Sequence, residues 1–186
     1  MKIAEERINK SKTLGDQLAS TAGDSSIDNV NALDLGPIKF KLMDANDGEG
    51  WSREKAEAVE IEYRRFLILN SLHADDALGI VPSQEVDTFW HYHILDTMKY
   101  ARDCDSVFGR FLHHFPYFGL RGEEDARKLA AATAETRALY RETFGVTAQA
   151  GQAADCSSAG CGAVVCQAGT CNAYMDPEVR PQLASV

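Results

Sequence analysis

Apolar positions recur at helical spacing in three stretches of the chain, which predicts three amphipathic helices. The first begins after Ser52 and ends near residue 73, the second covers residues 84–104 after Ser83, and the third spans about residues 122–144. Serine is a favoured N-cap residue, so both serines mark helix starts. No segment shows the period-2 alternation of a half-buried strand. The pattern therefore predicts an all-α fold.

The segments around these helices differ in composition. Residues 37–42 form a brief apolar patch, and residues 108–119 are aromatic and irregular, with Pro116 arguing against a regular element. After Gly145 the chain is rich in Ala, Gly, Ser and Cys and almost lacks large apolar side chains, so we expect a disordered tail. The predicted organisation is a polar N-terminal segment (1–35), a small helical His-rich domain with an irregular aromatic loop (36–145), and a low-complexity Cys-containing tail (146–186).

Charge narrows the functional classes. The 186 residues include 19 basic and 28 acidic side chains, for a net charge of −9. Such an acidic chain gains little from neutralising phosphate, so we expect neither nucleic acid nor an anionic membrane as a partner. No apolar run approaches the ~20 residues that cross a bilayer. Residues 1–7 are charged where a signal peptide would turn apolar, so the expected setting is cytoplasmic.

The candidate chemistry is concentrated in one segment. Four of the five histidines lie within 24 residues, in the company of an aspartate and a cysteine: Asp87, His91, His93, Cys104, His113 and His114. Imidazole, carboxylate and thiolate groups are ligands of divalent transition metals. The segment therefore predicts a site for Zn, Fe or Cu.

Helical geometry limits which of these groups can share one ion. At about 100° per residue, Asp87 and His91 lie on one face of the predicted helix, four residues apart. His93 and Cys104 share another face, but roughly 16 Å of helix axis separates them, which is too far for one ion.

Two arrangements remain open. In the first, which we favour, Asp87 and His91 meet one of His113 and His114 around a single metal ion. Only one of these two histidines is expected to take part, because consecutive residues usually point in different directions. In the second, His93 and Asp96 form the ligand face and His91 makes a structural hydrogen bond. Neighbouring side chains are expected to line a small, largely apolar pocket: Trp90, Tyr92, Asp96, Tyr100, Phe115 and Tyr117.

The tail has a pattern of its own, with a cysteine at every fifth position: Cys156, Cys161, Cys166 and Cys171. This is not the Cys-x-x-Cys spacing of most tetrahedral zinc sites. The thiolates could still surround a soft ion such as Zn²⁺ or Cu⁺, whereas a reducing cytoplasm opposes disulfides. A redox-sensitive spacer and a peptide substrate for modification are two further interpretations of the tail.

The histidine segment resembles a known family. Residues 86–100 read Val-Asp-x-x-Trp-His-x-His-Ile-Leu-Asp-Thr-x-x-Tyr, followed by Asp103-Cys104 and by His-His-Phe-Pro-Tyr-Phe-Gly over residues 113–119. This pattern is similar to that of the glycine-rich domain-containing protein-like family. The resemblance covers about residues 36–145 and implies a helical domain, but it implies no particular reaction.

The leading functional prediction is a small helical metalloprotein with a His/carboxylate site, whose chemistry would be hydrolytic or O₂-using if it is catalytic. Its substrate would be a small molecule or a peptide. The sequence shows no phosphate-binding loop, Gly-x-Ser-x-Gly elbow or His-Glu-x-x-His motif. One alternative is a non-enzymatic interaction module with structural histidines, which could recruit a protein partner through the tail. The other is a thiol-based metal carrier that uses the tail cysteines.

Overall fold

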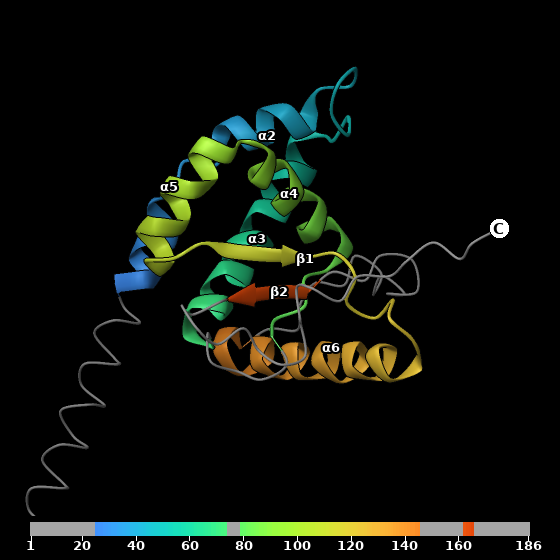
Figure 1. The fold of residues 1–186 in the computed structure, drawn as a ribbon. Helices are drawn as coiled ribbons and strands as arrows, with labels where there is room; N and C mark the ends of the chain where they lie inside the picture. The colour runs from blue at the N-terminus through green and yellow to red at the C-terminus, as the bar shows by residue number, and fades with distance from the viewer. Residues whose placement is uncertain (1–24, 74–78, 146–161, 166–186) are drawn as a thin grey trace, which may run out of the picture.

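The computed structural model describes residues 25–73 and 79–145, together with the backbone of residues 162–165 (Figure 1). These residues form a mostly helical fold, which confirms the predicted fold class. A helical segment over residues 25–32 precedes α2 (Gly36–Met43), α3 (Arg53–Leu72), α4 (Gln84–Leu95), α5 (Thr97–Phe108) and α6 (Glu123–Phe144). Two short strands, β1 (Leu112–Phe115) and β2 (Gly162–Val165), complete the described structure. Among the described helices, none combines the length and apolar character needed to cross a membrane.

The two predicted serine caps are confirmed, and they fix where the principal helices start. The Ser52 hydroxyl accepts a hydrogen bond from the Lys55 backbone N–H at 3.2 Å, and α3 begins one residue after Ser52. The Ser83 hydroxyl accepts from the Val86 N–H at 3.3 Å and starts α4. Because α4 begins at Gln84, Asp87 falls in its first turn.

The prediction of one helix over residues 84–104 is wrong. The helix breaks at Asp96, whose backbone dihedrals are not helical (φ −81°, ψ 71°); this residue ends α4 and caps α5. Its carboxylate accepts from the Lys99 N–H at 3.4 Å, and aspartate competes in this way with the helical hydrogen-bonding pattern. The break lets α5 fold back beside α4, where Tyr100 meets Trp90. α5 then continues to Phe108 and ends at Gly109.

The aromatic segment over residues 108–119 also contains a regular element that the sequence pattern did not indicate. Residues Leu112–Phe115 form β1, which pairs antiparallel with β2. The register places Leu112 opposite Val165 and His114 opposite Ala163. β2 belongs to the segment expected to be disordered. The other tail residues and residues 1–24 lie outside the described residues.

The core centres on α3, which packs against α2, α4 and α6. The Tyr63 ring lies 4.8 Å from that of Phe89, and the Phe66 ring lies 5.1 Å from that of Trp90, so aromatic pairs join α3 to α4. The apolar patch over residues 37–42 is part of α2. The core also includes Val30, which precedes the domain start suggested by composition.

A second, smaller apolar cluster lies between the loop after β1 and α6. Its buried members are Val81, Phe115, Phe118, Leu129 and Ala132. Gly119 has a φ of +89°, and a Cβ built there would lie 2.5 Å from Leu129 Cδ2. The positive φ favours glycine at this position, and any larger residue would also require the Leu129 side chain to move. This packing holds the C-terminal end of β1 against the domain.

Candidate metal centre

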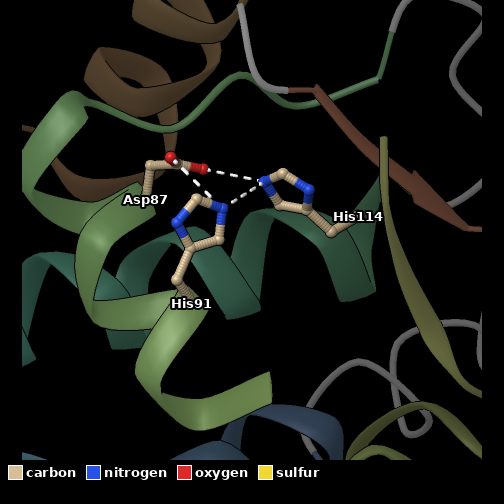
Figure 2. A group of neighbouring side chains, drawn as sticks. All are labelled: Asp87, His91 and His114. Atoms are coloured by element: carbon tan, nitrogen blue, oxygen red, sulfur yellow. Dashed lines mark hydrogen bonds and ion pairs between the residues drawn. The ribbon is translucent and has the colours of Figure 1, made fainter. Parts of the chain in front are cut away.

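Three potential ligands converge where α4 meets β1 (Figure 2). Asp87 and His91 lie one turn apart on α4, and His114 reaches them from β1. His114 Nε2 is 3.0 Å from Asp87 Oδ1 and 3.0 Å from His91 Nε2. His91 Nε2 is 3.6 Å from Asp87 Oδ2. This grouping matches the arrangement that the sequence analysis favoured.

The spacing of these atoms suits a transition-metal ion. Nitrogen and oxygen ligands lie about 2.0–2.2 Å from such ions, so neighbouring ligand atoms are about 3.0 Å apart at octahedral angles and about 3.4 Å apart at tetrahedral angles. His114 Nε2 lies 3.0 Å from His91 Nε2 and 3.0 Å from Asp87 Oδ1, and His91 Nε2 lies 3.6 Å from the other carboxylate oxygen, Oδ2. One ligand atom from each side chain lies within 4.8 Å of the other two, so the three side chains could share one ion after small adjustments.

The hydrogen-bond arrangement points the same way. His114 Nε2 faces both a carboxylate oxygen and a second imidazole nitrogen at hydrogen-bonding distance. A neutral imidazole nitrogen carries either one proton or one lone pair, so one proton would have to serve both contacts. A cation between the three groups would satisfy the carboxylate and both imidazole lone pairs together.

The three side chains differ in how deeply they are buried. The side chains of Asp87 and His114 are 9% and 10% exposed, whereas that of His91 is 46% exposed. A buried carboxylate needs a positive partner or several hydrogen bonds. Burial lowers the pKa of His91, the Asp87 charge partly opposes this, and His114 lowers it further. The lowered pKa favours the neutral imidazole, which is the form that binds metals.

Trp90 and Tyr100 help to position His114, Trp90 by ring contact and Tyr100 through hydrogen bonds to Trp90 and Leu112. The Trp90 ring lies 4.7 Å from the His114 ring. Trp90 Nε1 donates to the Tyr100 hydroxyl at 2.8 Å, and that hydroxyl donates to the Leu112 carbonyl at 2.5 Å. Because Leu112 lies two residues before His114 on β1, this network connects α4, α5 and the strand that carries the histidine.

His93 has a different role from the one that the second arrangement gives it. Its side chain is 2% exposed, its Nδ1 lies 2.8 Å from the Tyr63 hydroxyl, and its Nε2 lies 2.9 Å from Asp103 Oδ2. Lys99 pairs with the same Asp103 oxygen at 2.8 Å. Burial lowers the pKa of His93, and the Asp103 charge partly opposes this. Both ring nitrogens are engaged, so His93 is a structural histidine and offers no ligand atom.

The remaining predicted ligands also lie apart from the converging group. His113 is exposed, with its ring 4.9 Å from that of Phe111, because neighbouring residues of a strand point to opposite faces. Cys104 is a buried free thiol whose pKa is raised by burial. Asp96 is exposed and caps α5. The four tail thiols, Cys156, Cys161, Cys166 and Cys171, lie outside the described residues.

The six residues predicted to line a pocket do not form one enclosure. Trp90 packs against the His114 ring and Tyr100 hydrogen-bonds Trp90, but the Tyr92 hydroxyl donates to Glu49 at 3.1 Å. Phe115 packs with Tyr117 in the second apolar cluster. The break at Asp96 and the alternation of β1 separate these side chains. Tyr63, the partner of His93, could not be found from the sequence pattern, because no periodicity links positions on different helices.

These features define a mostly helical protein with two histidines and one aspartate gathered between a helix and a strand. The sequence profile of the UCP032817-like family matches residues 36–132, just over half of the chain, and the chain belongs to this family. Asp87, His91 and His114 all lie within the matched residues.

Two curated relatives agree with the resemblance noted from the sequence. The chain is 34% identical over 91 residues to glycine-rich domain-containing protein 1 of Arabidopsis thaliana, and 31% identical over 91 residues to glycine-rich domain-containing protein 2. Each match covers 48% of this chain and 11% of the relative, so the chain spans about a tenth of the length of these proteins. No solved structure matches the chain.

Proposed function

We propose that this protein binds one divalent transition-metal ion, Zn, Fe or Cu, through a carboxylate oxygen of Asp87 and the Nε2 atoms of His91 and His114. The observation that carries the proposal is the convergence of three acceptor atoms within 4.8 Å of one another on a buried carboxylate. A cation there would neutralise the Asp87 charge. The net charge of −9 adds a long-range field that favours cations over anions.

Three protein ligands leave room for further ligands, and His91 marks the exposed side of the group. With such an open position, the ion would supply Lewis-acid activation of water or, if it were iron, the O₂ chemistry typical of two-histidine, one-carboxylate sites. Asp87 and His114 would fix the position of the ion because both are largely buried. Trp90 would keep water from the rear of His114.

The test is metal content and a metal titration of the full-length, untagged protein. We expect about one equivalent of metal, and an affinity at least about tenfold lower in Asp87→Asn, His91→Gln and His114→Gln. His113→Gln is the matched control, because it changes the same residue type one position away on the exposed face of β1. No binding of any of the three metals, or an equal loss in the His113 control, would contradict the proposal.

A second set of variants separates this site from the tail. Replacing Cys156, Cys161, Cys166 and Cys171 together by serine should leave the equivalent of metal in place. Loss of the metal in this variant, with His114→Gln unaffected, would favour the thiol-carrier interpretation. A cytoplasmic setting, a small-molecule or peptide substrate and a protein partner of the tail are further parts of the proposal.

A further inference from the structure

β1 carries one of the three converging ligands, and among the described residues its strand partner is β2. The register sets Phe115 opposite Gly162, His114 opposite Ala163 and His113 opposite Val164. β2 therefore runs directly beside the strand that brings His114 to Asp87 and His91. The edge of β1 that receives β2 is part of the surroundings of the candidate metal centre.

The two strands belong to different parts of the chain. β1 falls inside the family match over residues 36–132, and β2 falls outside it. A strand edge exposes N–H and C=O groups that need hydrogen-bond partners. In the described structure these partners come from a segment beyond the matched domain. The shared domain thus presents an edge that an added strand can complete.

We propose that this edge of β1 is a binding site for an extended peptide, and that Gly162–Val165 is its occupant from the same chain. Strand addition of this kind takes its affinity mainly from main-chain hydrogen bonds and its selectivity from the residues at alternate positions. The occupant is uncharged and has glycine and alanine opposite Phe115 and His114. The preferred ligand is therefore an uncharged peptide with small residues at these two positions.

The further step, that a bound peptide is a substrate, rests on the proposed metal-binding function. A strand added to β1 runs about 4.8 Å from the backbone of His114, one strand spacing away. Peptides that bind there would lie next to the metal. The substrate class that the site would act on is then an extended peptide, and β2 would compete with it from within the same chain.

The experiment measures binding of a peptide to the full-length protein in which β2 has been disrupted. Successive residues of an antiparallel strand direct their N–H groups to opposite sides, so the double variant Ala163→Pro/Val164→Pro removes one N–H directed at β1. The probe is a fluorescent peptide of residues 160–167 with Cys161 and Cys166 replaced by serine. By anisotropy we expect it to bind the variant at least tenfold more tightly than it binds the wild type.

Two controls make the result specific. Ala153→Pro/Ala154→Pro places two consecutive prolines outside β2 and should bind the probe as weakly as the wild type does. A probe with proline at positions 163 and 164 should bind no form of the protein. Equal binding of the normal probe to the wild type and to the β2 variant, or binding of the proline probe, would overturn the proposal.

Amide hydrogen exchange of residues 112–115 gives a second measurement. We expect protection in the wild type, faster exchange in the β2 variant, and renewed protection when the probe is added. Each titration is run with Zn²⁺ and with a chelator. Probe binding without metal uptake would contradict the metal proposal alone, whereas metal uptake without probe binding would overturn the peptide site alone.

Discussion

His91 and His93 are two residues apart on the same helix and meet very different surroundings. His93 is enclosed, with a phenol on one ring nitrogen and a carboxylate on the other. His91 is about half exposed, and its Nε2 lies 3.0 Å from Nε2 of His114. An enclosed imidazole with two partners stabilises a core, whereas a half-exposed one beside a buried carboxylate retains a lone pair for a ligand.

The buried histidine leads to a prediction about pH. Burial lowers the pKa of His93 from its usual 6.5, so the unfolded chain binds a proton at a higher pH than the folded protein does. The contribution of neutral, buried His93 to folding stability is therefore complete above about pH 6.5. It is lost as the pH falls from there toward the pKa of His93 in the folded protein. The free energy of unfolding should decrease over this interval, by at most about 1.4 kcal/mol per pH unit for one histidine. Urea denaturation of metal-free protein between pH 7.5 and 5 measures it.

His93→Gln identifies the source of this slope. The variant should flatten the pH dependence and should also lower stability at pH 7.5 by about 1–3 kcal/mol, because Tyr63 and Asp103 lose an enclosed partner. His91→Gln should keep most of the slope, since its side chain is 46% exposed. An unchanged slope in His93→Gln would show that other groups cause the acid sensitivity.

At the scale of elements, the break at Asp96 decides where β1 lies. Because α5 folds back beside α4, Tyr100 can bond both Trp90 of α4 and Leu112 of β1. The hydroxyl is fully enclosed, and burial raises the pKa of Tyr100 well above that of an exposed phenol. The hydrogen bond from Tyr100 to Leu112 therefore connects α5, which carries none of the three candidate ligands, to the strand that carries His114.

Tyr100→Phe should therefore weaken metal binding although Tyr100 is not a ligand. Removing the hydroxyl leaves the Trp90 N–H and the Leu112 carbonyl without their partner, at a cost of about 1–3 kcal/mol in folding stability. Metal affinity should fall by about tenfold or more, as for other groups that orient ligands. Tyr92→Phe is the matched control, since its hydroxyl bonds the exposed Glu49 away from the site. Equal affinity in both variants would contradict the positioning role of Tyr100.

How far the sequence predicts each element depends on how local its cause is. Ser52 and Ser83 bond N–H groups three residues ahead, so the starts of α3 and α4 could be predicted from the sequence alone. Asp87 and His91 share a face because helical periodicity places residues four apart on the same side, which is also a local cause. β1 could not be predicted, because its partner lies about 50 residues further along the chain. The choice of His114 over His113 depends on that strand and was left open for the same reason.

At the scale of the whole molecule, the candidate metal centre joins parts of the chain that are distant in sequence. Asp87 and His91 are anchored in the main core by Phe89 and Trp90. His114 precedes Phe115, which packs into the second apolar cluster with Leu129 of α6. An ion held by these three side chains would bridge both clusters. Unfolding either cluster would then separate the ligands.

Metal binding should therefore stabilise the entire described domain. A ligand that binds only the folded state adds about 2.7 kcal/mol to the free energy of unfolding at a free concentration 100 times its Kd. Chemical denaturation of the full-length protein, with Zn²⁺ and with a chelator, should show this increase in wild type and in His113→Gln. His114→Gln should show almost none, because the link between α4 and β1 is lost. An equal increase in His114→Gln would place the stabilising ion elsewhere in the chain.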